Sequence, residues 1–143
     1  MDEKIDLVFD PSNPAAADYV RDRLSYFNAG ATGRSDYYPC NIYLKGEKGE
    51  TLGGLLGYVW SDWLFVATLW VDEAIRSKGH ATRLMDAAED YALKRGCHSA
   101  HLDTHSWQAR PFYEKRGYQL FATLDDFPPG HKKFFFRKKL VDR

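Results

Sequence analysis

The stretch Arg76-Ser77-Lys78-Gly79-His80-Ala81 decides how this chain is expected to fold. An apolar run at residues 64–71 precedes it, and an amphipathic helical pattern at residues 80–95 follows it. This order predicts a strand, a short cationic turn with glycine at its centre, and then a helix. Such a turn points free backbone N–H groups at one place, with the positive end of the helix dipole behind them. The arrangement favours binding of a phosphate-bearing ligand.

Length and composition narrow the class of protein. A chain of 143 residues predicts a single domain spanning 1–143. Hydrophobic residues make up 44% and aromatic residues 15% of the chain, which is enough for a globular core. Lys plus Arg number 20 and Asp plus Glu number 20, so the formal net charge is zero. A nucleic-acid partner therefore has no bulk electrostatic support.

The cysteines and the apolar runs indicate the compartment. Cys40 and Cys97 lie far apart and in no metal-like spacing, so we expect two free thiols and no metal site. The first four residues do not resemble the start of a signal peptide, and no apolar run approaches the ~18 residues of a membrane span. We therefore expect a cytoplasmic protein with no membrane partner.

The first half of the chain predicts one helix among several strands. Residues 5–10 have the pattern of a strand. Asn13 and Pro14 suit the N-cap and first position of a helix that Gly30 would close. Strands are predicted at 40–45, 51–61 and 63–71. Glycines 53, 54 and 57 indicate bulges or close backbone approach in the second of these, and the third is apolar enough to be buried on both faces.

The second half begins with the clearest helix of the chain, residues 80–95, whose apolar residues recur at spacings of three and four. Gly96 suits its left-handed stop. A short strand at 99–104 follows, and Pro111 and Gly117 bracket a short helix at 110–116. Two final strands are predicted at 118–124 and 133–140. This order of elements predicts an α+β (mixed α/β) fold.

Two blocks of sequence resemble one family. Residues 69–81 are similar to the acyl-CoA signature of the GNAT superfamily of N-acetyltransferases, in which Arg/Gln-x-x-Gly-x-Gly/Ala follows a strand that ends in Val. Residues 109–118 resemble the family's Ala-x-x-Phe-Tyr-Glu-Lys-x-Gly-Phe/Tyr motif. The resemblance implies a single GNAT-like domain with a mixed, mostly antiparallel sheet of six to seven strands and helices on both faces. It also implies that two central strands splay apart to admit the pantetheine arm of coenzyme A.

The same resemblance implies an acetyl-CoA site. The turn at 76–82 would hold the diphosphate through backbone N–H groups, and the main chain of residues 69–71 would bind the pantetheine arm and polarise the thioester. Relatives often carry Asn where this chain has Ser106, so Ser106 or Gln108 would replace that contact. The residues implied in binding are Leu69, Trp70, Val71, Arg76, Ser77, Lys78, Gly79, His80, Ala81, Thr82, Ser106 and Gln108.

Tyr113 is the catalytic candidate, because the family places a tyrosine beside the coenzyme A sulfur, where it protonates or hydrogen-bonds the departing thiolate. An amine nucleophile near pKa ~10.4 is almost wholly protonated at neutral pH, so a proton acceptor is also needed. We assign this role to Glu73, with Asp72, Asp103, His105 or an ordered water as alternatives. The residues expected to contact the acceptor are Asn28, Trp60, Asp103, His105 and Phe127.

Three functions remain in competition at this point. The first is an N-acetyltransferase that transfers an acetyl group from acetyl-CoA to a primary amine of a small molecule or peptide, by direct attack in a ternary complex. The second is a non-catalytic acyl-CoA-binding or sensing module, which would need the turn at 76–81 but no base. The third, a nucleic-acid-binding domain, is disfavoured by the zero net charge. The resemblance also suggests a homodimer.

Overall fold

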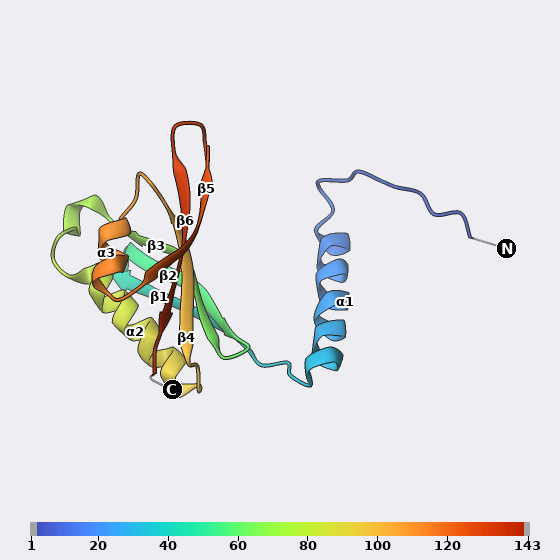
Figure 1. Ribbon diagram of the computed structural model, residues 1–143, viewed down its shortest axis with the longest axis horizontal. Coiled ribbons are helices and arrows are strands. Elements are labelled where there is room, and N and C mark those ends of the chain that lie inside the picture. Colours follow the sequence, from blue (N-terminus) through green and yellow to red (C-terminus); the bar gives the residue numbers. More distant parts are fainter. Residues whose placement is uncertain (1–2, 142–143) are drawn as a thin grey trace. The chain divides into compact units, whose positions relative to one another are not determined.

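A computed structural model describes residues 3–141 as two compact units, one up to Ser35 and one from Asp36 onward (Figure 1). The expectation of one domain over 1–143 stays a prediction. The first unit contains helix α1, Pro14–Thr32. The Asn13 side chain accepts a hydrogen bond from the Ala16 N–H at 3.1 Å, and Pro14 lies in the first turn. Both residues therefore start the helix in the predicted way.

Two predictions for the first unit are wrong. Helix α1 continues through Gly30 and ends at Gly33, which has a φ of 71° and donates its N–H to the Ala29 carbonyl at 2.8 Å. The left-handed backbone therefore falls three residues later than expected. Residues 5–10 form no strand, and their large apolar side chains are exposed. Alternating apolar residues suit a strand, but a strand forms only where a neighbour supplies ladder hydrogen bonds.

The second unit is built on a six-stranded sheet, in the order β1-β2-β3-β4-β6-β5. All neighbouring strands are antiparallel except β3 and β4, which are parallel. This arrangement confirms the predicted α+β class and the mixed, mostly antiparallel sheet. The strands are β1 Tyr37–Lys45, β2 Thr51–Trp60, β3 Trp63–Val71, β4 Ser99–His105, β5 Gln119–Asp125 and β6 Lys132–Lys139.

Helices α2, His80–Lys94, and α3, Arg110–Lys115, lie on the same side of the sheet (Figure 1). Helix α2 packs on β1, β2 and β3 through its predicted apolar stripe, in which Leu84, Met85 and Ala88 are almost fully buried. A short 3₁₀ turn, η1 Glu73–Ile75, links β3 to α2 and was not expected. These two helices cover one face of the sheet. That a helix, α1, covers the other face stays a prediction.

The parallel pairing of β3 with β4 stops after four residue pairs, the last being Val66 with Leu102. At this point β3 carries a bulge, because Ala67 has no partner in β2 between the pairs Gly57–Val66 and Leu56–Thr68. A bulge bends its strand and increases the local twist, so β3 diverges from β4. The expectation that β3 is buried on both faces is therefore wrong beyond Ala67, where its residues are exposed or half-buried.

Candidate active site

The gap between the diverging ends of β3 and β4 is a cavity of about 730 Å³. One wall is the last five residues of β3, from Ala67 to Val71, which have no ladder pairing to β4. The other wall is the end of β4, from Asp103 to His105, and Tyr113 of α3 also lines the space. The cavity therefore presents an unpaired strand edge to any molecule that enters it.

The turn before α2 has the conformation that the sequence predicted. Ser77 and Gly79 have positive φ angles of 63° and 83°, and Gly79 is the N-cap of α2. No side chain caps this helix, so the N–H groups of its first turn have no side-chain acceptor. Arg76 ties the turn to the end of β3, because its Nε donates to the Val71 carbonyl at 2.9 Å. The turn is thus held open beside the strand edge.

A second hollow, of about 380 Å³, continues the cavity toward this turn. Ser77, Gly79 and His80 line it, together with Thr82 and Phe112. The two hollows share Val71, Arg76, Ala81 and Ala109 as lining residues, so they form one groove. The groove runs from the N-terminus of α2 to Tyr113, which is the course that a long molecule with a phosphate at one end and a reactive group at the other would need.

Tyr113 lies at the inner end of the groove, with only 7% of its surface exposed. Its ring packs against Phe112, Tyr118 and Phe136, at centroid distances of 5.2, 6.0 and 6.4 Å. Burial, and secondly the negative charge of Asp103, raises the pKa of the Tyr113 phenol to about 12. Within residues 3–141 its hydroxyl makes no hydrogen bond. The phenol is therefore a neutral donor aimed at the cavity.

A family model described as "Acetyltransferase (GNAT) family" matches residues 5–118. The chain belongs to the GNAT acetyltransferase family. It is therefore an acetyltransferase of a family that uses acetyl-CoA as its acetyl donor. Membership of an acetyltransferase family disfavours the sensing module and the nucleic-acid-binding domain.

Two curated GNAT relatives and one solved structure are similar to the chain. Blasticidin-S acetyltransferase of Streptomyces morookaense is 41% identical over 99 residues, which cover 68% of this chain and 73% of the relative. An acetyltransferase of Agrobacterium fabrum is 33% identical over 130 residues, covering 91% and 95%. The crystal structure of an acetyltransferase from Bacillus cereus superposes with a TM-score of 0.80 at 28% identity, covering 93% and 97%.

Hydrogen bonds fix the end of β4 in this GNAT acetyltransferase. The Gln108 carbonyl oxygen accepts from the His105 backbone N–H at 2.9 Å and from the Thr104 hydroxyl at 3.1 Å, and it lies 2.9 Å from His105 Nδ1. Ser106 Oγ accepts from the Lys132 N–H at 3.0 Å and lies 3.2 Å from His131 Nδ1. Both predicted pantetheine contacts are thus already bonded within the protein.

The structure separates the predicted acceptor residues. Asp103 and His105 line the cavity, and the Phe127 ring stacks on His105 at 5.5 Å. Trp60 instead lines another cavity, of about 470 Å³, with residues of β3, β4 and β6. Asn28 belongs to α1 in the other compact unit, where its carbonyl accepts from Thr32 Oγ1 at 2.8 Å. The roles of Trp60 and Asn28 stay predictions.

The proposed base, Glu73, does not lie in the groove. It is exposed at the start of η1 and is absent from the residues that line either hollow. Neighbouring Asp72 is occupied as the cap of η1, because its carboxylate accepts from the Ala74 N–H at 2.8 Å. Because neither Glu73 nor Asp72 lines the groove, Asp103 and His105 are the proton-acceptor candidates among the residues that line the cavity. Lys78 is likewise exposed and lines neither hollow.

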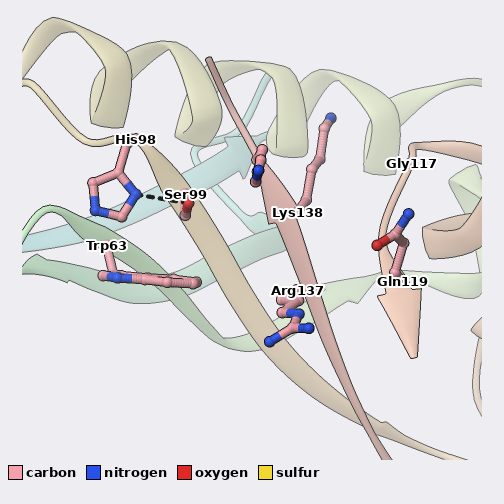
Figure 2. A pocket seen from close by; sticks show the side chains of 8 residues that line it. Trp63, His98, Ser99, Gly117, Gln119, Arg137 and Lys138 are labelled. Carbon is pink, nitrogen blue, oxygen red and sulfur yellow. Dashed lines mark hydrogen bonds between the residues drawn. The ribbon is translucent and has the colours of Figure 1, made fainter. Parts of the chain in front are cut away.

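A larger cavity, of about 880 Å³, lies where β4 and β5 begin. Figure 2 shows its wall, with Trp63 and His98 on one side and Arg137 and Lys138 on β6. Lys138 is occupied there, because its Nζ is 2.8 Å from a Glu89 carboxylate oxygen. Size therefore does not identify the site, whereas the unpaired strand edge and the open turn do.

Two aromatic residues of the site were missed by the sequence analysis. Trp107 lines the cavity and stacks on His105 at 4.6 Å, and His131 packs edge-on against Trp107 at 5.0 Å. The only signal for Trp107 was its place between Ser106 and Gln108.

Among residues 3–141, no group of three or more His, Cys, Asp or Glu side chains is arranged to hold a metal ion. In the same residues, no helix is both long enough and apolar enough to cross a membrane.

Proposed function

We propose that the protein transfers an acetyl group from acetyl-CoA to a primary amine, by direct attack of the amine on the thioester in a ternary complex. The observation that carries the proposal is the single groove from the open N-terminus of α2 to Tyr113, whose hydroxyl has no hydrogen-bond partner among the described residues. Such a groove has room for a donor that enters from the helix side and an acceptor that meets it between β3 and β4.

The groove fits coenzyme A by its chemistry. The uncapped N–H groups at the start of α2 suit the diphosphate, and the left-handed backbone at Gly79 holds them at the surface of the turn. Each such contact contributes about 0.3–2 kcal/mol, so several are needed together. The main chain of residues 69–71 pairs with β2 but not with β4, and its free side suits the amides of the pantetheine arm. We propose that Arg76, Ser77, His80, Ala81 and Thr82 complete the diphosphate site, and Lys78 adds a distant positive charge.

Tyr113 acts in this proposal as a hydrogen-bond donor to the leaving sulfur. Because the Tyr113 pKa is about 12, full transfer of its proton to a thiolate whose thiol has a pKa of ~8.5 would be uphill by about 3.5 units, or about 5 kcal/mol. A neutral phenol can still donate a hydrogen bond to a developing thiolate, and a buried site makes that bond stronger. The raised pKa thus favours stabilisation of the thiolate over full proton transfer.

Blasticidin S is the first acceptor to test, because a relative 41% identical over 99 residues is named for its acetylation. The assay measures release of the coenzyme A thiol from acetyl-CoA with blasticidin S and with a panel of primary alkyl and aryl amines. We expect turnover with at least one amine. Binding of acetyl-CoA without turnover on any amine would contradict the proposal and favour the sensing module.

Tyr113→Phe tests the role of the phenol. We expect kcat to fall by at least tenfold while the Kd for coenzyme A, measured by calorimetry, stays within about threefold, because only the hydroxyl is lost. Tyr43→Phe is the matched control, since Tyr43 is 52% exposed on β1 and lines neither hollow. Equal kinetics in the two variants would remove Tyr113 from the mechanism.

The homodimer and the cytoplasmic location are also proposals. Cys40 and Cys97 are both buried and form no disulfide within residues 3–141, which is the state that a reducing compartment maintains. Size-exclusion chromatography with light scattering measures the mass in solution, and a mass of one 16.5 kDa chain would contradict the dimer.

A further inference from the structure

We propose that His105 is the proton acceptor for the incoming amine, and that Gln108 holds its imidazole in the tautomer this role requires. The inference rests on the proposed N-acetyltransferase function and names a catalytic residue for it. The starting observation is that His105 lines the same cavity as Tyr113 and as the unpaired edge of β3.

The position of the imidazole is fixed by aromatic stacking. Its ring stacks with the rings of Trp107 and Phe127, at centroid distances of 4.6 and 5.5 Å and interplanar angles of 16° and 23°. The plane of the ring is therefore set by stacking. Its rotation within that plane is set by Gln108, whose side-chain oxygen lies 2.9 Å from Nδ1.

The same oxygen identifies the tautomer. It accepts the His105 backbone N–H at 2.9 Å, and because a backbone N–H is only a donor, the Gln108 atom at this place is the carbonyl oxygen. A carbonyl oxygen accepts hydrogen bonds and donates none, so the neutral imidazole carries its proton on Nδ1. Nε2 is then left with a lone pair, and among the described residues no hydrogen bond is made to it.

The other charged groups around His105 are already engaged. Asp103 on the same face of β4 pairs with Lys133 of β6 at 3.7 Å, and Lys133 also lies over the Phe127 ring. His131 bonds to Ser106, and Arg76 across the cavity bonds to the Val71 carbonyl. Tyr113 is a neutral donor. His105 Nε2 is therefore a side-chain acceptor at the cavity to which no described residue donates a hydrogen bond.

The reaction balances with this assignment. His105 Nε2 takes one proton from the ammonium form of the substrate and later releases it to solvent. The freed amine nitrogen forms a bond to the thioester carbonyl carbon, and the bond from that carbon to sulfur breaks. The second proton of the attacking nitrogen goes to the sulfur, which leaves as the thiol. An amine of pKa ~10.4 is almost wholly protonated at pH 7, which explains the need for an acceptor.

The test compares His105→Gln with the control His98→Gln, a replacement at the opposite end of β4. We expect His105→Gln to lower kcat with an alkylamine by about 100-fold, with a Kd for coenzyme A within about threefold of the unchanged protein. The acidic limb of the kcat/KM–pH profile should disappear. The loss should be smaller for amines that are neutral at the assay pH. His98→Gln should keep both the rate and the profile.

A second readout needs no turnover. The ¹⁵N NMR shifts of His105 in the protein without substrate should show a protonated Nδ1 and an unprotonated Nε2 at alkaline pH. In Gln108→Leu the two tautomers should mix, and kcat should fall. An Nε2-protonated tautomer in the unchanged protein, or an acidic limb that survives His105→Gln and vanishes in Asp103→Asn, would overturn the proposal. Absence of turnover by the unchanged protein would instead contradict the proposed function.

Discussion

The buried carboxylate of Glu89 offers the sharpest test of how the two helices are held together. Glu89 lies on the core side of α2 and is 9% exposed. Its two oxygens accept from Arg116 at 3.0 Å, from the Tyr118 hydroxyl at 3.1 Å and from Lys138 at 2.8 Å. Arg116 directly follows α3, so this one carboxylate joins α2, α3 and β6.

The expected cost of Glu89→Gln follows from these contacts. The glutamine amide keeps the shape of the Glu89 side chain but removes its negative charge. Its NH₂ group would then face Arg116 or Lys138 in place of the oxygen that accepted a hydrogen bond. Removing one partner of a buried ion pair costs about 3–5 kcal/mol. Arg116 and Lys138 have side chains 14% and 22% exposed, so water compensates in part and the low end applies. We expect the free energy of unfolding to fall by about 3 kcal/mol, or Tm by roughly 10 °C.

Urea denaturation followed by tryptophan fluorescence measures the change, with Asp86→Asn as the matched control. Asp86 also contacts Arg116, at 2.9 Å, but its side chain is 65% exposed, and we expect a loss below about 1 kcal/mol. A double-mutant cycle with Lys138→Met isolates the pair and should give a coupling above about 1 kcal/mol. A Glu89→Gln variant as stable as Asp86→Asn would refute the reasoning.

Three further predictions concern the core and the strand edge. The folded protein raises the pKa of Tyr113 to about 12, so the neutral phenol contributes its full stability below pH ~10 and this contribution is lost as the pH rises toward 12. Between pH ~10 and ~12, the free energy of unfolding measured by denaturation should therefore fall by roughly 2–3 kcal/mol more for the unchanged protein than for Tyr113→Phe. In Gly53→Ala the new methyl group would lie 2.8 Å from the Trp70 carbonyl oxygen, so urea unfolding should show a loss of about 1–3 kcal/mol, whereas an unchanged midpoint would contradict the close approach of β2 and β3. Burial raises the pKa of the Cys40 thiol, so peptide mapping after a thiol reagent at pH 8 should find Cys40 unmodified until denaturant is added.

Local patterns in the sequence were sufficient for the elements that carry their own signals. The stripe that includes Leu84 and Ala88 predicted α2, and Gly79 and Gly96 marked the turns at its ends, with φ angles of 83° and 80°. Pro111 predicted the start of α3. These features depend on neighbours within one or two turns of the chain, which is why the sequence alone was enough.

Features that depend on distant partners were not predicted. A strand at residues 5–10 requires a neighbour that no local pattern reveals, and the burial of Glu89 follows from cations 27 and 49 residues away. In the site, Tyr113 lines the cavity while Glu73 lies exposed at the start of η1, and the pairing of Gln108 with His105 arises from the turn after β4. To choose the proton acceptor among several carboxylates and imidazoles, one must know where each side chain points. Composition and residue spacing do not give that information.

The bulge at Ala67 has a consequence for how this enzyme tolerates change. Beyond it, the side chains of β3 are exposed or half-buried, and in the proposed complex the strand meets coenzyme A with its peptide groups. Most replacements at Thr68 or Trp70 preserve those peptide groups, whereas proline deletes an N–H and fixes φ. We therefore expect that side-chain substitutions in this segment leave the proposed binding of acetyl-CoA unchanged. Nearby residues can then change the preference for the amine acceptor without weakening that binding.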